Sequence, residues 1–210
     1  MDLTTNSISS ASDDEELEYK KQEKAPVHTE ISKDSTSDLP DYVDMKRKNW
    51  FSESNKHEEY EFDHAVSVFD VAAYILKKNG PMTTMKLQKL VYYSQAWSLV
   101  WDEEPIFKEN IEAWANGPVV KELFNYHRGQ YMISSVLIGN SELLNDKQKE
   151  TIDAVIDYYG DKPSQWLSDL THMEDPWRLS RMGIPEMQRG NRIIGLDLLS
   201  EYYGSLPPEE

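Results

Sequence analysis

The sequence predicts a mostly α-helical domain with a small antiparallel β-sheet (an α+β fold), preceded by a disordered acidic N-terminal tail. Two observations support this prediction. The composition changes near residue 60, and from Phe62 onward apolar residues recur at intervals of three and four, the spacing of one helix face. We therefore assign residues 1–60 to the tail and residues 61–210 to the domain.

The tail differs from the domain in charge and in apolar content. Residues 1–60 contain 15 acidic, 8 basic and only 16 apolar side chains, whereas residues 61–210 contain 65 apolar residues. A segment this polar cannot bury enough surface to offset the entropy lost on folding. One run differs, because three basic residues at 46–48 precede Trp50 and Phe51. This run is either a few contacts with the domain, a nascent helical turn, or a docking motif that orders on binding.

Helical spacing and capping residues predict the order of the helices. We expect them over residues 63–79, 85–100, 119–128, 146–159, 164–170, 175–181 and 196–203. Candidate N-caps are Asp63, Thr83 or Thr84, Asn145 or Asp146, and Ser164. The inner face of the first helix is predicted to be Val66, Phe69, Ala73 and Leu76. Stop signals follow at Gly80, Gly160 and Gly204.

The strands are predicted from short apolar runs. Residues 106–107 and 111–114 flank a polar turn, which predicts a small hairpin between them. Residues 116–118 form a turn that leads into the third helix, with Pro118 at its first position. Residues 131–138 are predicted to form a further strand.

The composition excludes several kinds of chemistry. The chain has no cysteine, which excludes disulfides, thiolate metal sites and cysteine nucleophiles. Its formal net charge of −16 argues against nucleic acid and anionic lipid as partners and suits a basic protein partner. No apolar run is long enough to span a membrane, and the first residues do not resemble a signal peptide. We therefore expect a cytoplasmic protein.

The most enzyme-like run is Thr171-His172-Met173-Glu174-Asp175-Pro176-Trp177. His172 and Glu174 have the spacing of the H-x-E motif of zinc deaminases, but that motif also needs cysteine ligands, which are absent here. A metal site completed by His127 or His64 stays open at this point. So does a structural role in which these side chains stabilise helix ends. No phosphate loop or dinucleotide fingerprint occurs, so we expect no cofactor.

Two further runs combine apolar and polar residues. In residues 86–97, Leu87, Leu90 and Trp97 are predicted to face the core. Lys86, Lys89 and Tyr93 are three and four residues apart, so they are predicted to share the opposite face. That face is either solvated or a contact surface for nucleic acid or an acidic partner. The other run, residues 112–120, connects a strand to a helix through a turn.

Taken together and in this order, the three runs resemble the Panacea domain of SocA-like antitoxins, also called the GepA or phage-associated domain. The family patterns are K-L-q-K-L-l-Y-y-x-q-x-W, E-A-W-x-x-G-P-V and T-H-x-E-x-P-W-x-x-a-R. The chain matches them at residues 86–97, 112–119 and 171–181. The resemblance covers residues 65–205 and leaves residues 1–60 outside.

The resemblance implies a compact helical domain without enzymatic activity. It also implies an antitoxin that neutralises a cognate toxin, encoded by an adjacent gene, through direct protein–protein binding. One family member is an adaptor that delivers its toxin to a ClpXP-type protease, and others occur in prophages. A protease adaptor and a phage-encoded regulator that binds a host protein therefore remain alternatives.

We expect the motif residues to form the framework of the domain, because a domain that binds diverse toxins keeps its core and varies its surface. These residues are Leu87, Leu90, Trp97, Glu112, Trp114, Gly117, Pro118, Thr171, His172, Glu174, Pro176, Trp177 and Arg181. Candidate contacts with a partner are Lys86, Lys89 and Tyr93, together with Trp50 and Phe51 in the tail. The tail is expected to thread across the toxin, to mark the protein for proteolysis, or to be a passive extension. It is acidic and has no helix-turn-helix pattern, which argues against DNA binding.

Overall fold

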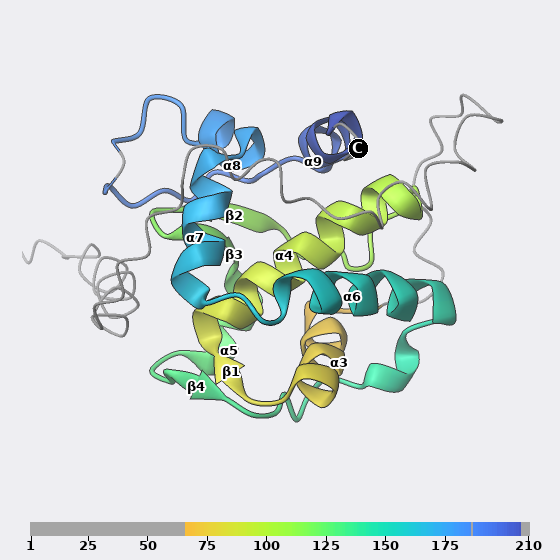
Figure 1. The fold of residues 1–210 in the computed structure, drawn as a ribbon. Coiled ribbons are helices and arrows are strands. Elements are labelled where there is room, and N and C mark those ends of the chain that lie inside the picture. Colours follow the sequence, from red (N-terminus) through yellow and green to blue (C-terminus); the bar gives the residue numbers. More distant parts are fainter. Residues whose placement is uncertain (1–65, 186, 207–210) are drawn as a thin grey trace, which may run out of the picture.

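The computed structural model describes residues 66–185 and 187–206. The predicted tail, with Trp50 and Phe51, lies outside the described residues, as do Asp63 and His64. Within the described part the predicted fold class is confirmed, because helices dominate and the named strands pair as two short antiparallel sheets (Figure 1).

The elements follow one another in a mixed order along the chain. The helices are α3 (Val68–Asn79), α4 (Thr84–Trp101), α5 (Lys121–His127), α6 (Asp146–Tyr159), α7 (Ser164–Met173), α8 (Asp175–Ser180) and α9 (Leu196–Ser205), with a 3-10 helix at Ser141–Leu143. The strands are β1 (Met82–Thr83), β2 (Ile111–Trp114), β3 (Gly117–Val120) and β4 (Met132–Ile133).

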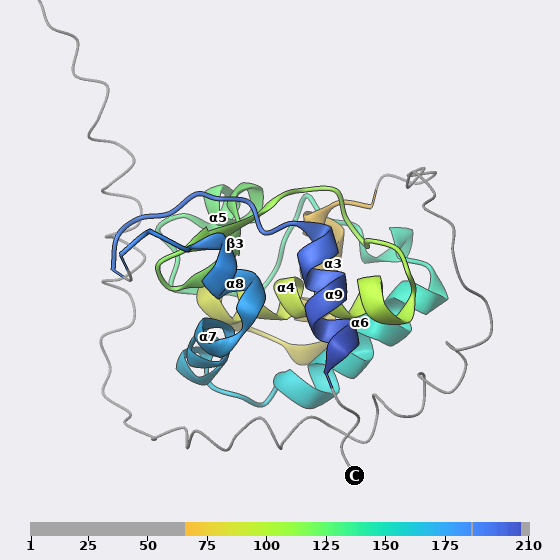
Figure 2. The same ribbon diagram turned by 90° about the horizontal axis from the view of Figure 1, so that it is seen from above.

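Helix α4 is the axis of the domain, and the other elements surround it (Figures 1 and 2). It packs against α3, α5, α6, α7, α9 and β3. From Thr84 to Val100, every side chain except that of Lys86 is buried. A helix buried on all sides is usually apolar on all sides, but α4 also carries glutamine, lysine and serine into the interior.

The buried polar side chains of α4 bond to the backbone of neighbouring loops. Gln95 Oε1 accepts hydrogen bonds from the backbone N–H groups of Ile106 (2.9 Å) and Phe107 (3.2 Å), and its Nε2 donates to the Phe107 carbonyl (3.0 Å). Gln88 accepts from the Val120 N–H at 2.9 Å. Ser98 Oγ donates to the Glu104 carbonyl at 2.7 Å. Because buried backbone groups need partners, these side chains allow non-helical segments to pack against α4.

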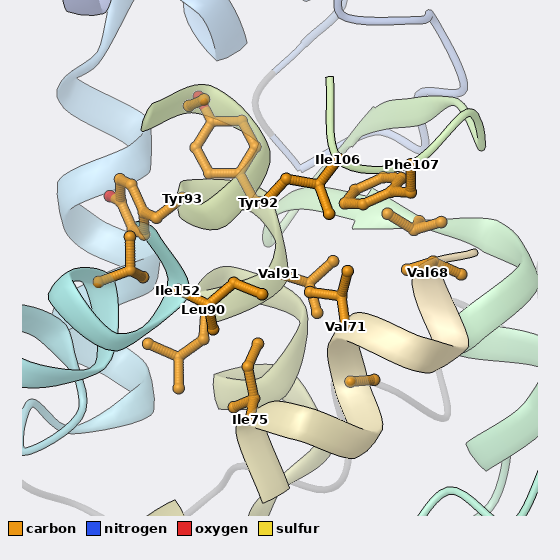
Figure 3. Packing of buried hydrophobic residues seen from close by; sticks show 14 of the residues in the cluster. Val68, Val71, Ile75, Leu90, Val91, Tyr92, Tyr93, Ile106, Phe107 and Ile152 are labelled. Carbon is orange, nitrogen blue, oxygen red and sulfur yellow. The ribbon is translucent and has the colours of Figure 1, made fainter. Parts of the chain in front are cut away.

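Helix α3 forms one wall of the core (Figure 3). Its fully buried residues Val68, Val71 and Ile75 lie beside Leu90 and Val91 of α4. The predicted inner face was only partly right. Val66 and Leu76 are buried, but Phe69 and Ala73 are only partly buried at the edge of the core.

Capping residues set most of the helix ends. The predicted start of the first helix at residue 63 is wrong, because the backbone N–H and hydroxyl of Ser67 both donate to Asp70 Oδ2, at 2.8 and 2.7 Å, and α3 begins at Val68. Thr83 and Asn145 cap α4 and α6 as predicted. Pro163, rather than Ser164, occupies the N-cap position of α7, and the Ser164 hydroxyl lies against that of Thr83.

The predicted strand pairing is wrong. Residues 106–107 do not pair with β2, because Gln95 holds their backbone groups. Instead β2 pairs with β3, from Ile111 opposite Val120 to Trp114 opposite Gly117. Pro118 therefore lies in a strand, and the third helix begins at Lys121.

The predicted strand over residues 131–138 is also shorter than expected. Only Met132 and Ile133 pair, with Thr83 and Met82 of β1. The chain then makes a tight turn, in which the Gly139 N–H donates to the Val136 carbonyl at 3.2 Å. The four predicted C-terminal helices are present, with ends within about three residues of the predicted positions. No helix of residues 66–185 and 187–206 is long and apolar enough to cross a membrane.

The role of Gln95 predicts a large loss of stability on Gln95→Leu. This change keeps a similar volume but leaves three buried backbone groups of Ile106 and Phe107 without their partner, at roughly 1–3 kcal/mol for each group. We expect the free energy of unfolding, measured by urea denaturation, to fall by about 3 kcal/mol or more. The matched control is Gln165→Leu on the exposed face of α7, which should change it by less than about 0.5 kcal/mol. Equal effects at the two positions would contradict the role assigned to Gln95.

Candidate functional site: a buried junction of three motifs

The three sequence motifs meet at one place in the fold. The β2–β3 hairpin packs against α4 and α7, which also pack against each other, and α8 follows α7 (Figure 1). We call this region the motif junction and define it by Lys89, Gly117, Thr171, Glu174 and Trp177. Its members come from positions up to 88 residues apart, so tertiary folding alone brings them together.

The hairpin turn is fitted tightly against α4 and α7. Gly117 has a φ of +103°, which favours glycine. A Cβ atom at this position would lie 2.7 Å from Thr171 Oγ1 and 2.9 Å from Lys89 Nζ. Lys89 is fully buried, and its ammonium donates to the Pro118 carbonyl at 3.2 Å. The family-pattern glycine is therefore required both by backbone conformation and by the two side chains that close over it.

Two buried nitrogen donors connect the α7–α8 corner to β2. Trp177 Nε1 donates to the Trp114 carbonyl at 2.8 Å, and Arg181 Nη1 donates to the Ala113 carbonyl at 2.9 Å. The Arg181 guanidinium also lies 5.2 Å from the centre of the Trp177 ring. Trp114 Nε1 in turn donates to Glu112 Oε2 at 2.8 Å. These contacts account for the tryptophans and the arginine of the motifs.

His172 is held within this corner. Its ring stacks on that of Trp177, with the centroids 4.1 Å apart. Burial, followed by the nearby charges of Lys89 and Arg181, lowers the pKa of His172 to about 4. The imidazole is therefore neutral at physiological pH, and it acts as a flat packing surface.

Glu174 points in another direction, into a group of tyrosines. It is 6% exposed, and its Oε2 accepts a hydrogen bond from the Tyr203 hydroxyl at 2.8 Å. The Tyr93 hydroxyl lies 3.4 Å from both carboxyl oxygens, and the Tyr92 hydroxyl is 3.0 Å from that of Tyr203. Tyr159 stacks on Tyr93 with ring centres 4.1 Å apart. One carboxyl group thus connects the α7–α8 corner with α4 and α9.

Burial raises the pKa of Glu174 to about 8, although the hydrogen bonds from Tyr203 and Tyr93 act to lower it. The carboxyl group is therefore largely protonated at neutral pH, which avoids an isolated negative charge in the core. A protonated carboxyl also has a hydrogen to donate, so it can share hydrogen bonds with the surrounding hydroxyls.

The predicted exposed face of Lys86, Lys89 and Tyr93 is wrong for two of the three residues. Lys89 and Tyr93 are fully buried, because α4 is covered on every side. Lys86 is half-buried, and its ammonium donates to the Gly160 carbonyl at 2.6 Å at the end of α6. These residues connect elements of the fold, and Lys89 and Tyr93 do not lie on the surface.

The other predicted framework residues also lie inside the domain. Leu87, Leu90 and Trp97 belong to the main core, and Pro176 is buried in the first turn of α8. Sequence analysis did not assign Gln88, Gln95, Tyr92, Tyr159 and Tyr203 to the site. The first three belong to the α4 run, where polar side chains in an otherwise apolar helix were the available signal. Helical spacing places Tyr159 on the inner face of its helix, but only the fold brings Tyr159 and Tyr203 near Glu174.

Among residues 66–185 and 187–206, no group of three histidine, aspartate or glutamate side chains is placed to hold a metal ion. His172 packs on Trp177 and Glu174 on tyrosine hydroxyls, so the two residues of the H-x-E run serve different neighbours. The junction residues connect segments that are distant in the sequence.

Large apolar side chains are exposed in two regions away from the junction. The first includes the turn after β4, where Leu137 is 86% exposed and Ile138 is 62% exposed. The second is the segment after α8, where Met182 is 67% exposed and Met187 is 71% exposed. Contiguous exposed apolar surface often marks a site of protein–protein contact.

These features define a class of protein: a small helical domain built around a buried central helix that holds a β-hairpin and a helical corner. Residues 87–178 match a protein-family model described as "Antitoxin SocA-like, Panacea domain". The match confirms the predicted resemblance to the Panacea domain family, and it includes most of each of the three motifs. A comparison with curated proteins found no match, and a comparison with solved structures found none either.

The packing around Gly117 predicts a strong effect of Gly117→Ala. A positive φ costs an alanine roughly 1–2 kcal/mol, and the clash with Lys89 and Thr171 adds roughly 1–3 kcal/mol of overpacking. Gly129 provides a matched control, because its φ is +77° but an added Cβ atom would have no neighbour within 4 Å. We expect Gly117→Ala to lower the free energy of unfolding by about 3 kcal/mol or more, and Gly129→Ala by only about 1–2 kcal/mol. Indistinguishable denaturation midpoints would rule out the close fit.

The raised pKa of Glu174 predicts that stability falls as the pH rises. The folded protein keeps this proton up to about pH 8, whereas an unfolded glutamate loses it near pH 4.3. Unfolding therefore releases a proton between these values. The lowered pKa values of His172 and His127, each about 4, act in the opposite direction below about pH 6.5. Together, these three groups favour the folded state most near pH 6.5.

Glu174→Gln tests this assignment because glutamine does not titrate. In the parent protein, Glu174 should remove about 2 kcal/mol of stability between pH 6.5 and 8, at about 1.4 kcal/mol per pH unit. Urea denaturation across this range should show a smaller decline for Glu174→Gln than for the parent. Glu122→Gln, at an exposed position on α5, should follow the parent profile. A parallel decline in Glu174→Gln would mean that other groups cause it.

Proposed function

We propose that the protein is an antitoxin that neutralises a cognate toxin by direct, non-catalytic protein–protein binding. The observation that supports this function is the match of residues 87–178 to the family described as SocA-like antitoxins. The geometry of the motif junction is consistent with it. The motif residues are engaged with one another inside the domain, which leaves the outer surface free to specify a partner.

The turn after β4 is the surface that we propose for the toxin contact. Its backbone is held firmly: the Tyr126 hydroxyl accepts a hydrogen bond from the Leu137 N–H at 2.9 Å, and Asp70 Oδ1 accepts one from the Asn140 N–H at 2.6 Å. A Cβ atom at Gly139 would overlap the Phe69 carbonyl oxygen, so the turn is pressed against α3.

The tip of this turn carries unusual residues. Tight turns usually place glycine, proline, asparagine or aspartate at their central positions. Here Leu137 and Ile138 occupy those positions and extend outward. A rigid turn that presents two aliphatic side chains suits an apolar pocket on a partner, because little conformational entropy is lost on binding.

The proposal is tested by co-expressing the protein with the adjacent small open reading frame and scoring growth and co-purification. We expect the neighbour alone to arrest growth, and co-expression to restore growth with a stable complex. Leu137→Asp combined with Ile138→Asp should abolish rescue and co-purification, because two charges cannot enter an apolar pocket. Both side chains are exposed, so the urea denaturation midpoint of the variant should stay close to that of the parent.

Ile193→Asp is the matched control, since Ile193 is 55% exposed and lies beside β2 rather than at the turn. It should preserve rescue. Rescue accompanied by disappearance of the neighbour protein would indicate a protease adaptor instead of a masking antitoxin. A neighbour that is not toxic would contradict the antitoxin role and favour a phage-encoded regulator that binds a host protein.

A further inference from the structure

A second surface differs from the rest of the chain in charge. The chain has six arginines, and four of them fall between residues 178 and 192. Residues 178–193 contain one acidic residue, Glu186, so their net charge is 4 − 1 = +3, in a chain whose net charge is −16. Arg178 and Arg192 are exposed, so an acidic partner is attracted to this segment more than to the rest of the domain surface.

The segment that carries this charge is held in place by buried contacts. Arg181 is 4% exposed, and its guanidinium donates to the carbonyls of Ala113, Pro185 and Gln188, at 2.9, 3.0 and 2.5 Å. At the other end, the Arg192 carbonyl accepts from the Ala113 N–H and the Ile194 N–H donates to the Ile111 carbonyl, both at 2.8 Å. The chain after α8 is thus fastened to β2 at both ends.

These contacts leave a mixed surface facing outward. Its exposed members are Arg178, Leu179, Met182, Met187, Arg192 and Ile193, which we call the arginine–methionine surface. The Arg192 guanidinium donates to the Met182 carbonyl at 2.7 Å, a neutral acceptor that does not cancel its charge. Methionine side chains are flexible and polarizable, so they adapt to different apolar neighbours.

Two carboxylates beside this surface, those of Asp175 and Glu112, are already engaged. Asp175 pairs with Arg178 at 2.9 Å, and Glu112, which lies opposite Ile193, accepts the indole N–H of Trp114. Both side chains of the ion pair between Asp175 and Arg178 are exposed, so the pair is weak. A denser group of carboxylates can compete for Arg178 and reach Arg192 at the same time.

The chain itself contains such a group. Residues 13–19 read Asp13-Asp14-Glu15-Glu16-Leu17-Glu18-Tyr19, with five carboxylates, one aliphatic and one aromatic side chain. Tyr19 is 66 − 19 = 47 residues before Val66, the first described residue. A chain of that length spans at most about 160 Å, whereas a domain of this size has a radius of gyration of about 14 Å. Residues 13–19 can therefore reach any face of the domain.

We propose that residues 13–19 dock on the arginine–methionine surface of the same chain. The carboxylates pair with Arg178 and Arg192, and Leu17 and Tyr19 cover the exposed methionines. Because the segment belongs to the same chain, its binding is intramolecular, so an interaction too weak to hold a free peptide suffices. The docked segment covers this surface until salt or an acidic partner displaces it. This inference does not depend on the antitoxin role.

Paramagnetic relaxation in the full-length chain tests the proposal directly. The chain has no cysteine, so Ser12→Cys provides a single site for a nitroxide label next to the acidic run. The ε-methyl NMR signals of the methionines report which surface the label approaches. We expect broadening at Met182 and Met187, and none at Met132, which is 50% exposed but lies in β4.

Two changes should remove the broadening and leave the fold intact. Replacing the five carboxylates by Asn or Gln, or raising the salt from about 0.05 M to about 0.5 M, should abolish it at both methionines. Arg192→Gln, at an exposed position, should weaken it. A label at Ser35→Cys is the matched control and should have a smaller effect.

Three results would overturn the proposal. No broadening at Met182 and Met187 would mean that the segment does not dock there. Equal broadening at Met132 would show unspecific contact over the whole domain. Stronger broadening from residue 35 than from residue 12 would assign the surface to a different acidic segment of the tail.

Discussion

The complete burial of α4 is the constraint on which the rest of the structure depends. A helix covered on every side must have a partner for each polar group that it carries inward, because an unpaired buried polar group costs roughly 1–3 kcal/mol. Gln88, Gln95 and Ser98 meet this requirement by bonding to the backbone of β3 and of the segment between α4 and β2. The same bonds fix the path of those segments. The buried polar side chains of α4 therefore hold β3 and the segment between α4 and β2 in place.

The motif junction extends this principle to the second half of the chain. Lys89 and Thr171 close over Gly117, Trp177 and Arg181 hold the backbone of β2, and Glu174 bonds to tyrosines of two helices, α4 and α9. The conspicuous residues of the sequence are thus engaged with one another, and their chemistry is directed inward. The spacing of His172 and Glu174 in the sequence suggests catalysis. In the structure, His172 packs on the indole of Trp177, and Glu174 is largely protonated among tyrosine hydroxyls. This arrangement supports a domain whose function lies on its surface.

That surface offers two features of different character. The turn after β4 is rigid and aliphatic, which suits a dry contact, whereas the segment after α8 is cationic and rich in methionine, which suits an acidic and adaptable contact. Both are held by side chains of the domain: buried Asp70 and partly buried Tyr126 for the turn, and buried Arg181 for the segment. Anchors of this kind allow exposed residues to change while the backbone that presents them stays in place.

Much of the secondary structure could be predicted from local sequence, because caps and helical spacing act over a few residues. Thr83, Asn145 and Gly80 marked helix ends correctly, and the mostly helical class with a small sheet followed from the same signals. The three motifs also sufficed to predict the family resemblance. The strand pairing and the burial of Lys89 and Tyr93 could not be predicted. The pairing of β2 depended on Gln95 bonding to the backbone of residues 106–107, and the burial depended on α6, α7 and α9 packing against α4. The sequence by itself determined which segments become helices, since that choice is local; the tertiary structure decided which polar residues are buried and what they bind, since those partners come from distant parts of the chain.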